Sequence, residues 1–345
     1  MLKLQSASLL WKDLHISPHE LRLNTLRCGQ SFRWKQLNES WVSVLNGKLV
    51  VLKETRKLTY KIHMDTCSHR KEQLLPSSVT EIRDYFQLDR VSLQQCYQRW
   101  SKIDPNFAKK SVNFQGIRML RQDPWENLIS FICSSNNNIS RISQMVNKMC
   151  VRFGKKAAIL DDTEFYEFPT LDEITTDDTK VESILRELGF GYRAKYIANT
   201  CSKIKADHPD LKEKWLHTLR DVPYEEAKSA LMTLQGVGPK VADCVCLMSL
   251  DQTESIPVDT HVWQIALRDY GFNSKKRGKT LDSKLYLQVG DHFRTLFGEY
   301  SGWAHSVLFT ADLKSFEVVD DNKKRKVVKK EQEITVVSKK TKKSE

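Results

Sequence analysis

The first third of the chain alternates apolar and polar residues in short runs, a pattern typical of strands buried on one face. The runs that we predict as strands of an antiparallel sheet are residues 32–34, 41–45, 48–52 and 58–62. Asn46 and Gly47 separate two of these runs and predict a tight hairpin, because both residue types accept positive φ angles. Helices near residues 79–86 and 93–100 are expected to complete this sheet unit, which we place at residues 1–115.

Beyond about residue 116 the apolar residues recur at the three- and four-residue spacing of helices. Asp123, Pro124 and Glu126 predict a helix start, because an Asp cap, a Pro in the first turn and a Glu three residues after the cap all favour one. Further helices are predicted at residues 139–153, 181–188, 192–205, 223–234 and 239–250. The predicted class is therefore α+β, with the sheet domain first and a helical domain at residues 116–313.

Residues 314–345 carry basic clusters at 323–326 and 339–343 and no aromatic residue after Phe316. A segment of this composition cannot build a core, so we predict a disordered basic tail. The clusters fit a nuclear-import signal, a loose DNA tether or a plain solvated tail. We therefore expect a nuclear protein, with a mitochondrial fraction left open.

Composition narrows the choice of partner. The net charge is +12, and because the tail holds only part of it the folded body is itself basic, which favours a polyanion such as nucleic acid. No apolar run approaches the length of a membrane span, so we expect no membrane contact. The eight cysteines form no C-x-x-C pair or zinc-type cluster, and we expect reduced thiols, no metal and no cofactor. We also expect a monomer.

The candidate chemistry lies in a Gly-Val-Gly-Pro-Lys segment and in an aspartate downstream of it. Gly236 and Gly238 allow a tight turn with exposed amides, and Pro239 suits the first position of a new helix. Such amides form a site for an anion such as a DNA phosphate. Lys240 stands beside that site, and Asp259 follows after room for a helix and a return loop. An amine and a carboxylate at one backbone phosphate predict nucleophilic chemistry on a nucleotide sugar. A hairpin that only grips DNA is the alternative.

This pattern resembles the helix-hairpin-helix/Gly-Pro-Asp superfamily of DNA glycosylases, with its paired helices at 223–234 and 239–250. Four further segments are similar to those of the eukaryotic 8-oxoguanine DNA glycosylases: residues 29–34, 131–139, 188–194 and 302–309. The resemblance runs from about residue 20 to about residue 313. It implies a sheet domain packed against a helical domain of two parts. The iron–sulfur cluster of several relatives cannot form here, because no cysteine follows Cys246.

The resemblance implies an enzyme that flips the damaged nucleotide out of the duplex, because a stacked base cannot be reached. Lys240 matches the nucleophile that attacks the sugar, expels the base and forms a Schiff base, after which β-elimination cleaves the strand. Asp259 matches the carboxylate that favours positive charge developing on the sugar. The implied substrate is double-stranded DNA with 8-oxoguanine, or a ring-opened purine, opposite cytosine.

Base selection is implied by four positions. Gly29 matches the glycine whose carbonyl reads the hydrogen that 8-oxoguanine carries at N7, where guanine has a lone pair. Cys244 and Phe309 match the residues that sandwich the flipped base. His305 departs from the family, which has Gln at the Watson–Crick edge of the base. Only a neutral imidazole offers the acceptor needed there, so we expect base affinity to fall on acidification between about pH 5 and 8, and less in His305→Gln.

Other segments are implied to contact the duplex. Asn136 matches the residue that fills the gap left by the extruded base, and Tyr192 matches the residue that wedges the stack. Arg141 and Arg193 match the arginines that recognise the estranged cytosine, whose acceptors suit a guanidinium fork. The positions that match phosphate contacts are Gly236, Val237, Gly238 and His261.

Two other interpretations stay open. One keeps the fold but makes a ring-opened purine the principal lesion, with His305 as the cause. The other is a catalytically silent lesion-binding protein that uses the hairpin as a clamp. The presence of both Lys240 and Asp259 argues against a silent protein, because replacement of either would have removed the chemistry.

Overall fold

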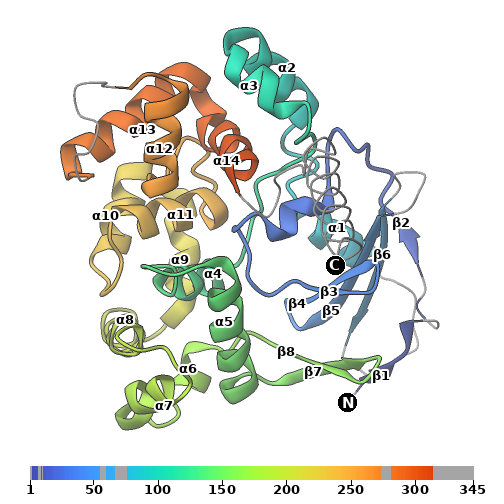
Figure 1. The fold of residues 1–345 in the computed structure, drawn as a ribbon. Coiled ribbons are helices and arrows are strands. Elements are labelled where there is room, and N and C mark those ends of the chain that lie inside the picture. Colours follow the sequence, from blue (N-terminus) through green and yellow to red (C-terminus); the bar gives the residue numbers. More distant parts are fainter. Residues whose placement is uncertain are drawn as a thin grey trace, which may run out of the picture.

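The computed structural model describes residues 2–6, 9, 11–54, 60–66, 76–272 and 281–313, which form two sheets and a larger set of helices (Figure 1). The strands are β1 (Leu2–Leu4), β2 (Lys12–Asp13), β3 (Lys35–Leu37), β4 (Ser40–Leu45), β5 (Lys48–Glu54), β6 (Tyr60–Thr66), β7 (Lys156–Leu160) and β8 (Thr163–Tyr166). The α-helices are α1 (Pro76–Tyr85), α2 (Leu93–Ile103), α3 (Pro105–Ser111), α4 (Pro124–Ile132), α5 (Ile139–Phe153), α6 (Leu171–Ile174), α7 (Val181–Glu187), α8 (Arg193–Asp207), α9 (Trp215–Thr218), α10 (Tyr224–Met232), α11 (Pro239–Ser249), α12 (Thr260–Asp269), α13 (Ser283–Phe297) and α14 (Ser301–Asp312). The predicted α+β class is confirmed.

The larger sheet is antiparallel, with strand order β2-β6-β5-β4-β3. Strands β4 and β5 pair from Ser40↔Lys53 to Leu45↔Lys48, and the chain turns between them at Asn46 and Gly47. Their φ angles are +49° and +71°, which confirms the predicted hairpin. The strand predicted at residues 58–62 is found as β6, although residues 58 and 59 lie outside the described part of the chain.

Residues 32–34 are not a strand, which corrects the prediction; β3 begins one residue later. Their aromatic side chains enter two different cores, and a regular strand buried on one face could not serve both. Phe32 lies in the core of the helices, whereas Trp34 lies against the sheet and donates through Nε1 to the Tyr85 hydroxyl at 3.0 Å. Arg33, between them, donates to the Glu126 carboxylate at 2.7 Å. This segment joins the sheet to the helices.

A second, three-stranded sheet was not predicted; its strands β7 and β8 lie inside the region expected to be helical. They form a hairpin that turns at Asp161 and Asp162, whose φ angles are +45° and +62°. Aspartate tolerates such angles, so this Asp-Asp pair was the missed turn signal. Strand β1 pairs with β7 in parallel and ties the start of the chain to this hairpin (Figure 1).

Burial divides the described residues into three clusters. The largest spans the helices, a second lies between the large sheet and α1, and a third lies between that sheet and β7–β8. Helix α2 contributes Leu93, Tyr97 and Trp100 to the helical cluster, where Trp100 packs edge-on against Phe297 of α13. The apolar face of α2 thus packs on helices, and whether α2 belongs to the sheet unit stays a prediction. The domain boundary at residue 115 stays a prediction.

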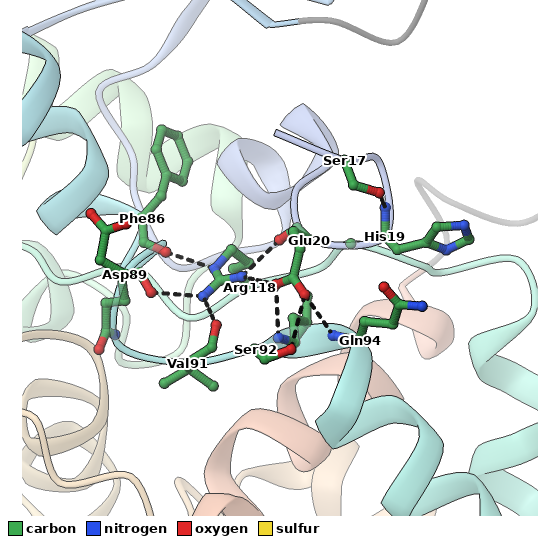
Figure 2. Close-up of polar contacts among 12 residues, drawn as sticks. Ser17, His19, Glu20, Phe86, Asp89, Val91, Ser92, Gln94 and Arg118 are labelled. Carbon is green, nitrogen blue, oxygen red and sulfur yellow. Dashed lines mark hydrogen bonds and ion pairs between the residues drawn. The ribbon is translucent and has the colours of Figure 1, made fainter. Parts of the chain in front are cut away.

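A buried arginine holds together segments that are far apart in the sequence (Figure 2). Arg118 is 0% exposed and donates from all three guanidinium nitrogens: Nε to Phe86 O at 2.7 Å, Nη2 to Gln87 O and Val91 O at 2.7 and 2.6 Å, and Nη1 to both the carbonyl and the carboxylate of Glu20 at 2.9 and 2.8 Å. Burial alone would raise the pKa of Glu20, but the first amides of α2 and Arg118 together hold it below its usual value.

Neighbouring residues in the sequence set where several helices begin. Asp123 caps α4 by accepting from the Glu126 amide at 2.9 Å, as predicted, and Asn138 caps α5 by accepting from the Arg141 amide at 3.0 Å. The paired helices predicted at 223–234 and 239–250 are α10 and α11. Among the described residues no helix is both long and apolar enough to cross a membrane. The predicted tail at residues 314–345 lies outside the described residues.

Candidate active site

The turn between α10 and α11 is shaped by its glycines. Gly236 has a φ of +81°, and a Cβ on it would lie 2.8 Å from Cβ and Cδ2 of Tyr196, so no larger residue fits. Gly238 is the N-cap of α11 and supplies no side-chain hydrogen bond to the helix start. The first amides of α11 therefore keep their capacity to bind an anion. The residues that line the shallow groove over this turn are Ser135, Tyr192, Tyr196, Gln235, Gly236, Val237 and Gly238.

Lys240 lies in the first turn of α11, immediately behind that hairpin. Its Nζ is 3.2 Å from Ser134 Oγ and 5.0 Å from the centre of the Phe131 ring. The Ser134 hydroxyl donates to Phe131 O at 2.7 Å, so its lone pairs are left to face the lysine. The amine is thus held by an acceptor and an aromatic face, and none of the contacts described for it is with a carboxylate.

Asp259 is the N-cap of α12, and its Oδ1 accepts from the amides of His261 and Val262 at 2.9 and 3.0 Å. Two main-chain bonds fix the carboxylate, and Oδ2 is not used in the cap. The Asp259 charge acts on both Cys244 and His305, and the Lys240 charge acts on Cys244 as well. The structure therefore brings the two predicted catalytic residues to one site.

The residues predicted to bind the base also gather there. A Cβ on Gly29 would lie 3.8 Å from Phe309 Cε1, and the Phe309 ring lies 6.1 Å edge-on from His261 and 6.4 Å from His305. Cys244 is 2% exposed, and burial raises its pKa to about 12 although Lys240 acts in the opposite direction. The Cys244 thiol is thus uncharged. Gly29 itself has a φ of +85°, which favours glycine.

The surroundings of His305 bear on the pH dependence of base affinity that the sequence predicts. It is 6% exposed, and neither ring nitrogen has a hydrogen-bond partner. Burial lowers its pKa to about 4, with the Asp259 charge acting in the opposite direction. The imidazole is therefore neutral throughout the range of about pH 5 to 8, where we had expected it to titrate. This low pKa argues against a change of base affinity in that range caused by His305.

The segment before α5 carries or contacts residues that are expected to insert into the duplex or to read its opposite strand. Asn136 is exposed and has a φ of +46°. Ser135 O accepts from Arg193 Nη2 and from the Tyr192 hydroxyl, the latter at 3.0 Å, and Asn136 O accepts from the same guanidinium at 3.2 Å. The Arg193 guanidinium also lies 4.5 Å over the Tyr192 ring. Arg193, at 3% exposure, thus holds the loop that presents Asn136, whereas Arg141 is exposed.

Two site residues were missed from the sequence. Ser134 touches the candidate nucleophile, and only its place in the segment 131–139 could have indicated this. Gln30 follows Gly29, is 1% exposed, and donates through Nε2 to Arg118 O at 2.8 Å while its Oε1 accepts from the Leu120 amide at 2.9 Å. These bonds fix the backbone beside Gly29.

A hairpin between two helices, with a lysine on the second and an aspartate capping the next, defines a helix-hairpin-helix DNA glycosylase. A family model described as HhH-GPD superfamily base excision DNA repair protein matches residues 129–287. A second model, described as 8-oxoguanine DNA glycosylase, N-terminal domain, matches residues 13–128. The chain belongs to the 8-oxoguanine DNA glycosylase/lyase family.

Similar proteins and solved structures support the same family assignment. The N-glycosylase/DNA lyase of Saccharomyces cerevisiae is 40% identical over 332 residues, covering 87% of this chain and 85% of its own. The N-glycosylase/DNA lyase OGG1 of Arabidopsis thaliana is 40% identical, covering 88% and 80%. A structure of MBOgg1 with a low affinity DNA ligand has a TM-score of 0.72 at 30% identity, covering 86% and 93%. The Clostridium acetobutylicum 8-oxoguanine glycosylase/lyase bound to dsDNA with cytosine opposite 8-oxoG has a TM-score of 0.71 at 26% identity, covering 87% and 96%.

Proposed function

We propose that this protein is a bifunctional glycosylase/lyase that removes 8-oxoguanine, and ring-opened purines, from opposite cytosine in double-stranded DNA. The observation that carries the proposal is the placement of Lys240. It directly follows a hairpin whose amides can bind an anion, and it lies beside Cys244. The charge of Asp259 acts on the same Cys244. The names of the relatives and the DNA in the Clostridium structure support it.

The geometry suits nucleophilic attack by an amine. Lys240 Nζ, in its unprotonated form, attacks the sugar carbon that bears the base; the glycosidic bond breaks, and the base leaves with the bonding electrons and takes up a proton. Opening of the sugar gives the Schiff base. Removal of a proton from the neighbouring sugar carbon then expels the 3′ phosphate, and water releases Lys240. Asp259, fixed by two amides, supplies the negative charge that favours the cationic sugar.

The base would be read by neutral groups. Gly29 offers its carbonyl, Cys244 an uncharged thiol surface, and Phe309 a ring face. His305 would accept from the Watson–Crick edge of the base with one ring nitrogen, because burial keeps the imidazole neutral at physiological pH. Both of its nitrogens lack partners in the free protein, which leaves them available to a flipped base.

The two arginines predicted to face the opposite strand would have different tasks. Arg193 uses one terminal nitrogen to hold Ser135 and Asn136, so its fork serves mainly to present the Asn136 loop. Arg141, exposed in the first turn of α5, has its guanidinium available for the acceptors of cytosine. A monomer acting in the nucleus completes the proposal, the location resting on the basic clusters of the sequence alone.

The test is single-turnover excision on four duplexes that carry 8-oxoguanine opposite each base in turn. We expect the fastest excision opposite cytosine, and loss of that preference in Arg141→Ala. Arg152→Ala, on the exposed far end of α5, is the matched control and should retain the preference. Tight lesion binding without excision by the wild type would refute the proposal and favour a silent lesion-binding protein.

A further inference from the structure

A buried cluster of polar side chains joins α11 to the loop before α12, outside the site described above. Its centre is Asp243, which is 0% exposed and lies one helical turn beyond Lys240. Its Oδ1 accepts from the Tyr224 hydroxyl at 2.6 Å, and its Oδ2 lies 3.1 Å from Lys228 Nζ and accepts from the Tyr286 hydroxyl. A buried carboxylate with this many partners is fixed in place.

Tyr286 extends this cluster to the main chain next to Asp259. The Val258 amide donates to the Tyr286 hydroxyl oxygen at 3.3 Å. A carboxylate and a carbonyl can only accept, so the hydroxyl hydrogen of Tyr286 goes to Asp243, with Ile256 O as a more distant acceptor at 3.4 Å, and the hydroxyl lone pair receives the Val258 amide. Burial and then the Asp243 charge raise the pKa of Tyr286, so the hydroxyl keeps this hydrogen. The direction of both hydrogen bonds is therefore determined.

We propose that Tyr286 is a positioning residue that sets the Asp259 carboxylate relative to Lys240, by tying the main chain of Val258 to Asp243 on the lysine-bearing helix. Val258 directly precedes Asp259 and is 1% exposed, so a shift of its backbone moves the N-cap of α12. Asp243 shares α11 with Lys240, so the two catalytic groups are linked through three buried residues. The inference rests on the proposed function, because it concerns the rate of that reaction.

Tyr224 provides a matched control. Like Tyr286 it is a buried tyrosine whose hydroxyl donates to Asp243, but its other hydrogen-bond partners are Lys228 and Ser255 rather than Val258. Tyr224→Phe and Tyr286→Phe therefore both remove one donor from the same carboxylate, and only Tyr286→Phe cuts the link to Val258. A purely structural role of the cluster predicts the same result for both variants.

The experiment compares the two variants in the full chain for single-turnover excision of 8-oxoguanine opposite cytosine and for binding to a duplex with a tetrahydrofuran abasic analogue. We expect Tyr286→Phe to slow excision about tenfold or more, since small misplacements of catalytic groups are costly, and Tyr224→Phe to slow it less than about threefold. Binding to the tetrahydrofuran duplex should stay within about twofold in both, because neither variant touches the groove over the hairpin. Equal slowing in the two variants would overturn the proposal.

Amide hydrogen exchange supplies a second readout that needs neither DNA nor activity. The Val258 amide should be protected in the wild type and in Tyr224→Phe, and should lose protection in Tyr286→Phe. Fast exchange of this amide in the wild type would overturn the proposal even if Tyr286→Phe failed to fold. Absence of excision by the wild type, by contrast, would refute the proposed function itself.

Discussion

His305 gives the most quantitative prediction, because a buried neutral histidine ties stability to pH. Its pKa is about 4 in the folded protein and 6.5 in the unfolded chain, so between these values the unfolded chain binds more protons. Stability from this group is therefore fully present above about pH 6.5 and is lost as the pH falls toward 4. The difference of 6.5 − 4 = 2.5 in pKa corresponds to about 3 kcal/mol in all, at about 1.4 kcal/mol for each unit.

The assay is urea unfolding of the wild type and of His305→Gln at about pH 7 and about pH 5. The wild type should lose about 2 kcal/mol more than the variant between these two values, because other titrating groups are common to both proteins. The same low pKa predicts that base affinity owes no change to His305 between about pH 5 and 8. An equal loss of stability in the two proteins would show that His305 is not neutral and buried, and would refute the reasoning.

The other predictions concern the framework. Gly236→Ala should lower the free energy of unfolding by about 2 kcal/mol or more, because the methyl group meets Tyr196 at 2.8 Å in a left-handed conformation. Gly238→Ala, with nothing within 4 Å of its Cβ, should stay within about 0.5 kcal/mol, and urea unfolding distinguishes the two. Arg118→Met should cost about 3–5 kcal/mol because it leaves several buried carbonyls unpaired and removes the cationic partner of Glu20, against less than about 0.5 kcal/mol for Arg152→Met on an exposed helix end. Equal losses in the paired variants would contradict these assignments.

Features set by neighbouring residues could be predicted from the sequence. The Asn46-Gly47 hairpin and the Asp123 cap each depend on a few adjacent positions, and both were found as expected. Residues 32–34 show the limit of such local rules. The β-prone composition is real, but the separate cores that receive Phe32 and Trp34 are set by contacts with distant parts of the chain.

In the candidate site, too, some residues could be predicted from the sequence and others could not. Lys240 and Asp259 could be proposed because a motif of glycines, lysine and a following aspartate carries its own geometry. Ser134 is 106 residues from Lys240 in sequence, and no spacing rule connects a serine to a lysine at that separation. The low pKa of His305 could not be predicted either, because it follows from burial among residues of several elements. The Arg118 contacts likewise join its own segment to two others, at Glu20 and at residues 86–91.

The central claim, that Lys240 is the nucleophile, is tested most directly by borohydride trapping on a duplex with 8-oxoguanine opposite cytosine, followed by mass-spectrometric mapping of the adduct. Lys203→Gln, which removes a half-buried lysine of α8 that is paired with Asp207, is the control beside Lys240→Gln. The account predicts a covalent adduct on Lys240 in the wild type and in Lys203→Gln, and none in Lys240→Gln. An adduct that persists in Lys240→Gln, or maps to another residue in the wild type, would contradict it.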